Sequence, residues 1–326
     1  MFAQALEAIL RDHCTPARVR AVEDGSSSQE LWDLIRDAGF LDLMAPEADG
    51  GGGLTLAQFY PVLLAIGRYA VPLPLAQSMA ARALVSDPAA LPSSPLSLAP
   101  GSVVRQDGAL VCPLVPHGLQ VTHILMARAG RLMLMDASSA ERMHAGTPGR
   151  LTATLVWAPG RPDGLDLGAD TGQLEAWGGA LHAGLIASAM AHVFEMTLKH
   201  CNDREQFGRP LGKYQAVQHQ LSVMAQQVVA SNIASQAAFQ ADERSPDLMA
   251  AAVAKSRASE AAVGVANTAH ALHGAIGVTA DYDLQLYTRR LHEWRMAHGS
   301  ELWWNQKLGE AVLTSQQGLA QFVQAL

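Results

Sequence analysis

The sequence predicts a mainly α-helical fold with a small β domain between two helical regions. Apolar residues recur at helical spacing in residues 1–90 and again after residue 170, whereas the stretch between them is rich in Pro, Gly and Ser and carries short apolar runs. A chain of 326 residues is long enough for two or three domains. We expect an N-terminal helical domain at 1–90, a middle β domain at 91–170 and a C-terminal four-helix bundle at 171–326.

The N-terminal region is expected to form short helices joined by turns. In residues 31–44, apolar side chains recur near helical spacing until Gly39 ends the first run. Glycines within 46–53 and prolines within 72–74 predict turns. Charged side chains interrupt the first 14 residues where a signal peptide would be apolar, so an amphipathic helix is expected there.

The middle region carries the signals of β-strands. Residues 128–131 lie between two apolar runs and predict the connection of a hairpin. In the segment 151–158, Thr152, Thr154 and Val156 alternate with apolar neighbours, which predicts a further strand.

The C-terminal region predicts long helices. Val217, Leu221, Met224 and Val228 follow one another at i, i+4, i+7 and i+11, which places an apolar stripe along one helix. Pro246 then breaks the chain. The helices expected after this break span 247–273, 284–297 and 300–325, and their short connections favour an antiparallel bundle.

The segment 176–198 is long and apolar enough to raise the question of a membrane span. His182, His192 and Glu195 interrupt it, and Ala, Gly and Ser dominate its composition. Small residues also suit close packing between helices, so we expect a buried bundle helix and no membrane partner.

Composition excludes several functional classes. The net charge is −7 and no run of like charges marks a basic stripe, so nucleic acid is not expected as a partner. The three cysteines lie far apart and form no C-x-x-C pair, which argues against a disulfide framework or a zinc ribbon. A reducing, cytoplasmic location fits this usage best.

Several catalytic motifs are absent from the sequence. No G-x-G-x-x-G follows a strand, no G-x-S-x-G is present, and 208–214 lacks the spacing and the Ser/Thr of a P-loop. His292 and His298 do not form H-E-x-x-H, and His270 and His273 have no nearby carboxylate or Cys to complete a metal site. Nicotinamide, hydrolase and nucleoside-triphosphate chemistry are therefore not expected, and no metal is expected either.

Two segments together resemble one family. Residues 203–219 read D-R-E-Q-F-G-R-P-L-G-K-Y-Q-A-V-Q-H, similar to the R-x-x-F-G-x-P-(I/L)-x-x-x-Q element of acyl-CoA dehydrogenases. Residues 272–279, L-H-G-A-I-G-V-T, with L-Y-T-R-R at 286–290, resemble the H-G-G-x-G-x-T…L-Y-x-R-R element of one branch of that family. The runs at 31–53 and 66–74 resemble its N-terminal pattern, so the resemblance covers nearly the whole chain.

The resemblance implies a site for FAD. Arg204 matches the arginine whose guanidinium offers bidentate hydrogen bonds to the pyrophosphate, commonly that of a neighbouring subunit's FAD. Phe207 would pack on the cofactor and Gln215 would supply an amide. At His273 and Gly274, helix-end N–H groups and small residues would suit the adenosine diphosphate half. The implied cofactor-binding residues are Arg204, Phe207, Gly208, Gln215, His273, Gly274 and Gly277.

The sequence departs from the family where catalysis is concerned. The implied reaction is α,β-dehydrogenation, in which a carboxylate takes the α-proton of the thioester and the β-hydrogen leaves as hydride to the flavin. The usual catalytic glutamate aligns with His298, and the alternative position falls near Gly179, so both carboxylates are missing. A histidine can serve as a base near neutral pH. Ala271 and Ala275 also replace a Gln and a Gly of the family pattern.

The family element that lies along flavin and substrate in the β domain is not recognisable, and 96–101 is its nearest remnant. This loss resembles shortened subunits that assemble as α2β2 heterotetramers, in which one subunit supplies the base and both build the FAD site. Such pairs are associated with bulky substrates such as steroid side-chain CoA esters. His298 is then expected to be a relic of the catalytic position rather than the base.

The leading hypothesis is therefore an acyl-CoA dehydrogenase subunit that acts on an acyl-CoA thioester, as a homo-oligomer or with a related chain, and passes electrons to an electron-transfer flavoprotein. Two alternatives stay open. One is a non-catalytic subunit that completes the FAD and thioester site of another chain. The other is a homo-oligomeric flavoenzyme with altered chemistry, such as an oxidase or a reductase.

Overall fold

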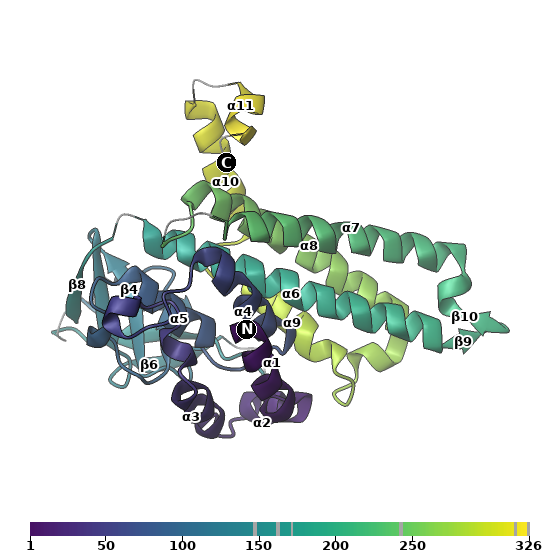
Figure 1. Ribbon diagram of the computed structural model, residues 1–326, viewed down its shortest axis with the longest axis horizontal. Coiled ribbons are helices and arrows are strands. Elements are labelled where there is room, and N and C mark those ends of the chain that lie inside the picture. The colour runs from purple at the N-terminus through teal and green to yellow at the C-terminus, as the bar shows by residue number, and fades with distance from the viewer. Residues whose placement is uncertain (146–148, 161–163, 171, 241–243, 316–317, 325–326) are drawn as a thin grey trace.

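The structure is a computed structural model that describes residues 1–145, 149–160, 164–170, 172–240, 244–315 and 318–324. Short N-terminal helices pack beside a long helical bundle, and the β-sheets lie at one end of the molecule (Figure 1). The predicted fold class, mainly helical with a small β domain in the middle of the chain, is confirmed.

Short helices build the N-terminal region. Thr15 caps one of them by accepting a hydrogen bond from the Arg18 amide, and Pro16 occupies its first position. Thr55 and Gln58 form a reciprocal capping box at another. Gly39, at φ 79°, follows the third helix where the sequence predicts an end. The elements are α1 (Phe2–His13), α2 (Pro16–Glu23), α3 (Gln29–Asp37), η1 (Phe40–Asp42), η2 (Glu47–Asp49), α4 (Leu56–Arg68), α5 (Leu75–Leu84) and η3 (Pro88–Ala90).

The β domain contains two four-stranded sheets in its described part. One has the order β1-β4-β5-β8 and the other β2-β3-β7-β6; β1 pairs with β4 in parallel, and the other pairs are antiparallel. The strands are β1 (Leu96–Leu98), β2 (Val103–Val104), β3 (Leu110–Val115), β4 (His123–Arg128), β5 (Arg131–Asp136), β6 (Glu141–His144), β7 (Ala153–Trp157) and β8 (Leu165–Ala169).

The predicted hairpin is confirmed. Arg128 of β4 pairs with Arg131 of β5, and the two residues between them, Ala129 and Gly130, have φ angles of 50° and 74°. Two positive φ angles in a two-residue loop match the right-handed twist of the flanking strands. The predicted strand within 151–158 is β7.

The C-terminal bundle is built of α6 (Gln173–Asp203), α7 (Gln215–Ala237), α8 (Leu248–His273) and α9 (Leu284–Met296). A small hairpin of β9 (Glu205–Gln206) and β10 (Arg209–Pro210), followed by η4 (Leu211–Lys213), joins α6 to α7. Asp247 caps α8 by accepting hydrogen bonds from the next helical amides, and η5 (Gly274–Val278) follows that helix. The helices predicted at 247–273 and 284–297 are therefore confirmed.

The single helix predicted at 300–325 is wrong. The structure has α10 (Glu301–Thr314) and a separate α11 (Leu319–Gln324). Ser315 is extended and Gly318 precedes the second helix. Glycine is a poor helix former, and here its low helix propensity has a stronger effect than the helical spacing of the apolar residues on either side. Helix α10 packs against α8 and buries Trp304, whereas α11 stands away from the body of the molecule in Figure 1.

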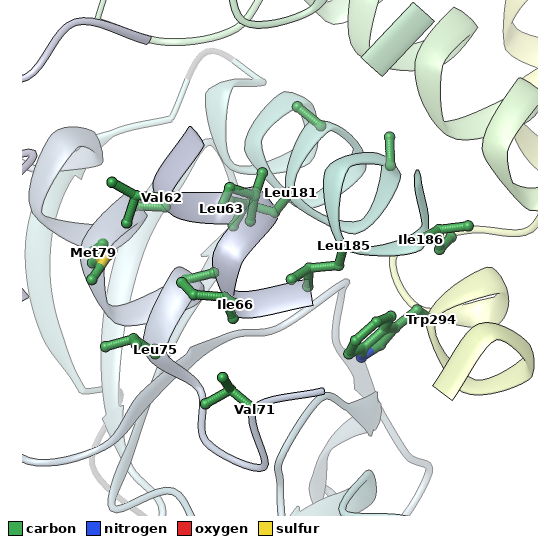
Figure 2. Close-up of a cluster of buried hydrophobic side chains, with 14 of the residues drawn as sticks. Val62, Leu63, Ile66, Val71, Leu75, Met79, Leu181, Leu185, Ile186 and Trp294 are labelled. Carbon is green, nitrogen blue, oxygen red and sulfur yellow. The ribbon is translucent and has the colours of Figure 1, made fainter. Parts of the chain in front are cut away.

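The N-terminal helices and the bundle share one core. Leu63 and Ile66 of α4 lie between α5 and the α6 residues Leu181 and Leu185, and Trp294 of α9 closes the cluster on the far side of α6 (Figure 2). These side chains are at most 3% exposed. Helix α6 is thus the central element, and its long apolar sequence reflects burial within the protein: by length and composition alone it could cross a membrane, yet 67% of its most apolar window is buried inside the molecule.

Candidate functional site

Two pockets contain four of the eight site residues predicted from the sequence, namely Arg204, His273, Gly274 and His298. The first, called here the arginine pocket, has a volume of about 520 Å³ and lies where α6 ends and η5 follows α8. It brings together segments that are about 70 residues apart in the sequence. Its lining residues are His200, Arg204, Gln206, Leu211, Val217, Ala271, Leu272, His273, Gly274, Ala275 and Ile276.

Arg204 is the residue at which α6 ends, and its side chain is exposed. No ion pair to its guanidinium is found among the described residues. The β9–β10 hairpin follows, with Phe207 at φ 52° and Gly208 at φ 83° in its turn. The Tyr214 hydroxyl donates to the Gln206 carbonyl at 2.9 Å and so holds the hairpin to the next segment. An unpaired guanidinium at the mouth of a pocket can bind an anion.

The other wall of the arginine pocket comes from the end of α8. His273 is 5% exposed, and its Nδ1 lies 2.8 Å from the Ala269 carbonyl oxygen. Gly274 follows at φ 65°, a left-handed conformation that favours glycine. At Gly277, an added methyl group would lie 2.8 Å from the His273 Cβ, so glycine lets the chain turn back closely over the helix end.

Of the seven residues predicted to bind a cofactor, Arg204, His273 and Gly274 line the arginine pocket. Phe207, Gly208, Gln215 and Gly277 do not line it. Phe207 is 91% exposed at the tip of the β9–β10 hairpin, and Gln215 is exposed at the start of α7. His200 also lines the pocket although no sequence motif marks it; its position one helical turn before Arg204 is the signal that the sequence offers.

The second pocket, called here the His298 pocket, has a volume of about 450 Å³ and lies between the β domain and the start of α6. Residues just after β1, which the sequence marks as the remnant of the flavin-contacting element, form one side of it. Its lining residues are Ala99, Pro100, Gly101, Ser102, Ala127, Asp170, Gly172, Leu174, Glu175, His298, Gly299 and Trp303.

The His298 ring is buried, and it makes one hydrogen bond and one stacking contact. Nε2 lies 3.2 Å from the Leu98 carbonyl oxygen, which accepts, and the ring stacks on His182 with centroids 5.1 Å apart. With Nε2 as the donor, Nδ1 is the basic nitrogen, and it faces α6 where a methyl group at Gly178 would lie only 2.1 Å away. Burial lowers the pKa of His298 to about 4. The imidazole is therefore neutral and weakly basic at neutral pH.

Two glycines on α6 make room for these rings. Gly178 faces His298, and at Gly179 an added methyl group would lie 2.7 Å from Trp304 Cζ2. The indole of Trp304 fills the space above α6 and its Nε1–H donates to the His298 carbonyl at 2.9 Å. The position that sequence alignment gives to the alternative glutamate, near Gly179, thus lies under an aromatic ring.

Buried Lys255 fixes the turn that carries His298. Its Nζ lies 2.8–3.0 Å from the Ser259 hydroxyl and from the backbone oxygens of Trp294, Arg295 and Gly299. Burial lowers the pKa of Lys255 to about 7, with Arg295 acting in the same direction and Glu301 opposing it.

Both carboxylates that line the His298 pocket have partners. Asp170 accepts hydrogen bonds from the Gly172 and Leu174 amides at the start of α6, at 3.1 and 3.3 Å. Glu175 pairs with Lys307 of α10 at 2.5 Å. Among the described residues, no group of three or more His, Cys, Asp or Glu side chains is placed to hold a metal ion.

The two pockets lie at opposite ends of α6. Leu174 and Glu175 in its first turn line the His298 pocket, whereas His200 in its last turn lines the arginine pocket. At about 1.5 Å per residue, the helix separates these ends by roughly 40 Å. Figure 1 shows the same separation, with the β domain at one end of α6 and the β9–β10 hairpin at the other.

Comparison with known protein families identifies the class of this chain. Family models match residues 1–89, described as the acyl-CoA dehydrogenase N-terminal domain, and 176–303, described as the C-terminal domain. The chain belongs to the acyl-CoA dehydrogenase family, whose members are FAD-dependent oxidoreductases.

Within this family, the chain is similar to several individual proteins. Acyl-CoA dehydrogenase IpdE2 of Mycobacterium tuberculosis is 31% identical over 301 residues, which cover 90% of each chain. Among solved structures, a chain of the ChsE4-ChsE5 complex from Mycobacterium tuberculosis superposes with a TM-score of 0.85 at 21% identity and 97% coverage of both chains. A chain of the Tcur3481-Tcur3483 steroid acyl-CoA dehydrogenase, G363A variant, gives a TM-score of 0.80 at 27% identity, with 95% and 96% coverage.

Proposed function

We propose that this chain is one subunit of a FAD-dependent acyl-CoA dehydrogenase that introduces an α,β double bond into an acyl-CoA thioester, with a FAD site shared between two chains. The observation that supports the shared site is the separation of the two pockets along α6. Because roughly 40 Å lies between them, a single FAD would not contact Arg204 and His298 of the same chain.

The residues of the arginine pocket fit the diphosphate of FAD. The Arg204 guanidinium is exposed to the pocket, and the buried Nε2 of His273 has no hydrogen-bond partner in the described part of the chain. The guanidinium suits phosphate oxygens, and Nε2 of His273 does so when it is protonated. Gly274 leaves open space beside the backbone, with nothing within 4 Å of an added methyl group. FAD, when bound, supplies the acceptor for the hydride that leaves the substrate.

The exposed surface next to this pocket supports an assembly with another chain. Residues 215–240, which include α7, contain no Asp, Glu, Lys or Arg. Val223, Val229 and Ile233 of α7 are each more than half exposed, and so is Phe207 on the adjacent hairpin. An uncharged helix with exposed aliphatic side chains is typical of a protein–protein interface. We propose that a related acyl-CoA dehydrogenase chain covers α7, in an α2β2 or homo-oligomeric assembly.

We further propose that the partner chain supplies the carboxylate base. His298 is hydrogen-bonded, stacked and held by a low pKa in its neutral form, and the two carboxylates of its pocket are paired. The same observations favour the second candidate function, a non-catalytic subunit that completes the other chain's site. Steroid-derived acyl-CoA thioesters are the proposed substrates because a relative at 27% identity is described as a steroid acyl-CoA dehydrogenase. A cytoplasmic location and an electron-transfer flavoprotein as acceptor remain parts of this proposal.

The experiment is to purify the chain alone and co-expressed with candidate partner chains, and to record absorbance at about 450 nm before and after anaerobic addition of a steroid side-chain CoA ester. The shared-site proposal expects FAD only in the assembled complex, and bleaching when substrate is added. A chain that holds FAD and bleaches as a monomer would contradict the shared site. A complex whose flavin content and activity survive loss of the Arg204 guanidinium would contradict a role of the arginine pocket in either candidate function.

A further inference from the structure

Two histidines form a stacked pair in the arginine pocket. His200, near the end of α6, and His273, at the end of α8, have ring centroids 4.4 Å apart and an interplanar angle of 26°. Both line the pocket together with Arg204. The pair joins α6 and α8 at the pocket that Arg204 also lines.

The hydrogen bonding of His273 leaves one nitrogen unused. Its Nδ1 lies 2.8 Å from the Ala269 carbonyl oxygen, and because a carbonyl only accepts, Nδ1 must carry a hydrogen. In the neutral ring, Nε2 is then a bare acceptor. It is buried and has no hydrogen-bond partner in the part of the chain that the structure describes. A phosphate oxygen cannot donate to it, but a protonated Nε2 would donate to that oxygen.

The charged groups on α6 that face the histidine pair have opposite effects on the pKa of His200. Desolvation and the Arg204 charge lower the pKa of His200, whereas Asp203 raises it. Asp203 is itself paired with Lys199 at 2.5 Å, which weakens its effect on the histidine.

The groups on the other elements add little charge. Burial lowers the pKa of His273, the Ala269 carbonyl raises it, and His200 and His270 lower it. The Tyr282 ring lies 5.3 Å from the His273 ring, between α8 and α9. Without an anion, the pair is therefore kept uncharged around neutral pH, because among the described residues no carboxylate forms an ion pair with either ring.

We propose that His200 and His273 are further anion-binding residues, and that the pair takes up one proton when a phosphate group binds beside Arg204. The proton goes to Nε2 of His273, which then donates to a phosphate oxygen, while the stacked His200 ring stays neutral because two imidazolium rings 4.4 Å apart would repel each other. Cofactor affinity then increases as pH falls. The identity of the phosphate as that of FAD rests on the proposed function; the proton uptake does not.

The test uses ADP, which carries a diphosphate and an adenosine, as the probe for the full chain in its assembled form after FAD has been removed. Isothermal titration calorimetry at about pH 7 in two buffers of different ionisation enthalpy should show net uptake of up to one proton per ADP, and affinity should rise by up to about tenfold per pH unit as pH is lowered. His273→Gln should abolish the uptake, and His200→Gln should reduce the affinity. Arg204→Lys should weaken binding but keep the uptake.

His13→Gln is the matched control, because His13 is exposed on α1 and does not line the pocket; it should behave as the unchanged protein. A proton NMR titration provides a second readout: the apparent pKa of His273 should rise when ADP is added. If ADP binds with no proton uptake, or if His273→Gln keeps it, this inference is wrong while the cofactor site stands. If ADP does not bind at all, both fail.

Discussion

Arg290 of α9 and Glu23 of α2 form an ion pair in which both side chains are 3% exposed or less, with Nη2 2.8 Å from Oε1. Arg290 also pairs with Glu293 at 2.6 Å, and Glu293 accepts hydrogen bonds from the amide and hydroxyl of Thr152, just before β7. These contacts join the N-terminal helices, the bundle and the β domain at one point. The His298 pocket also draws its residues from the β domain and the bundle.

Breaking the junction should destabilise the fold strongly. Arg290→Met leaves two buried carboxylates without their shared partner, and we expect the free energy of unfolding to fall by about 3–5 kcal/mol, measured by urea denaturation. Arg131→Met is the control, because Arg131 pairs with Asp166 on the surface and such pairs contribute little. Equal losses in the two variants would contradict this account.

Lys255 should make stability depend on pH. Its folded pKa of about 7 lies below the ordinary 10.5. Between those values the unfolded chain binds more protons, so the free energy of unfolding should rise with pH across this window. Lys255→Met should remove that rise and also leave the backbone oxygens around the His298 turn without a donor. Urea denaturation from about pH 7 to about pH 10 measures it; Lys199→Met, at an exposed lysine, should retain the slope.

Arg204→Ala should weaken FAD retention by about 1.5–3 kcal/mol, the contribution of a hydrogen bond to a charged group. Flavin content after gel filtration of the assembled protein measures it. Arg209→Ala, which removes a guanidinium that stacks on Tyr214 in the same hairpin and does not line the pocket, should retain the flavin. Unchanged flavin content in Arg204→Ala would show that this arginine does not hold the cofactor.

His298→Ala should leave the turnover of the assembled complex within a few-fold, since the ring is engaged with Leu98 and His182. A catalytic base would instead cost about 10²–10⁴-fold in the chemical step while flavin binding survives. Rapid-mixing flavin reduction, with the chain alone and with its partner, separates the two outcomes. His298→Gln keeps a polar group of similar size, so a large loss shared by both variants would identify His298 as the base.

Ile233→Asp should impair assembly, because it places a charge on the uncharged exposed face of α7. Light scattering at micromolar concentration should show a smaller species than the unchanged protein. Val104→Asp is the matched control: Val104 is similarly exposed, at 60%, but lies on β2. A stable monomer for the unchanged chain would overturn the proposed assembly.

Local signals predicted much of the fold. The 128–131 hairpin and the long helix ending before Gly274 follow from turn residues and apolar spacing, which act over a few positions. The parallel pairing of β1 with β4 depends on contacts between segments that are distant in sequence, so no local pattern indicates it. The break between α10 and α11 rests on a single glycine, which is only a weak signal in the sequence.

In the candidate site, too, some features could be predicted from the sequence and others could not. Arg204 and His273 could be singled out as cofactor-binding residues because each sits in a distinctive motif, and the structure places both at one pocket. The engagement of His298 could not, since it depends on Gly178 lying across from a residue 120 positions later and on a carbonyl of β1. Nor could the stacking of His200 on His273, because neither spacing nor composition indicates which faces of α6 and α8 meet.

The length of helix α6 sets the distance between the arginine pocket and the His298 pocket. Each residue of an α-helix adds about 1.5 Å of length and about 100° of rotation. One inserted or deleted residue between Gly179 and His200 would therefore turn Arg204 to a different side of the molecule relative to the His298 pocket. In a complex whose chains complete each other's sites, that rotation would misalign both sites at once. Substitutions in α6 should consequently impair the complex far less than insertions, even at positions where the side chains of α6 touch neither pocket.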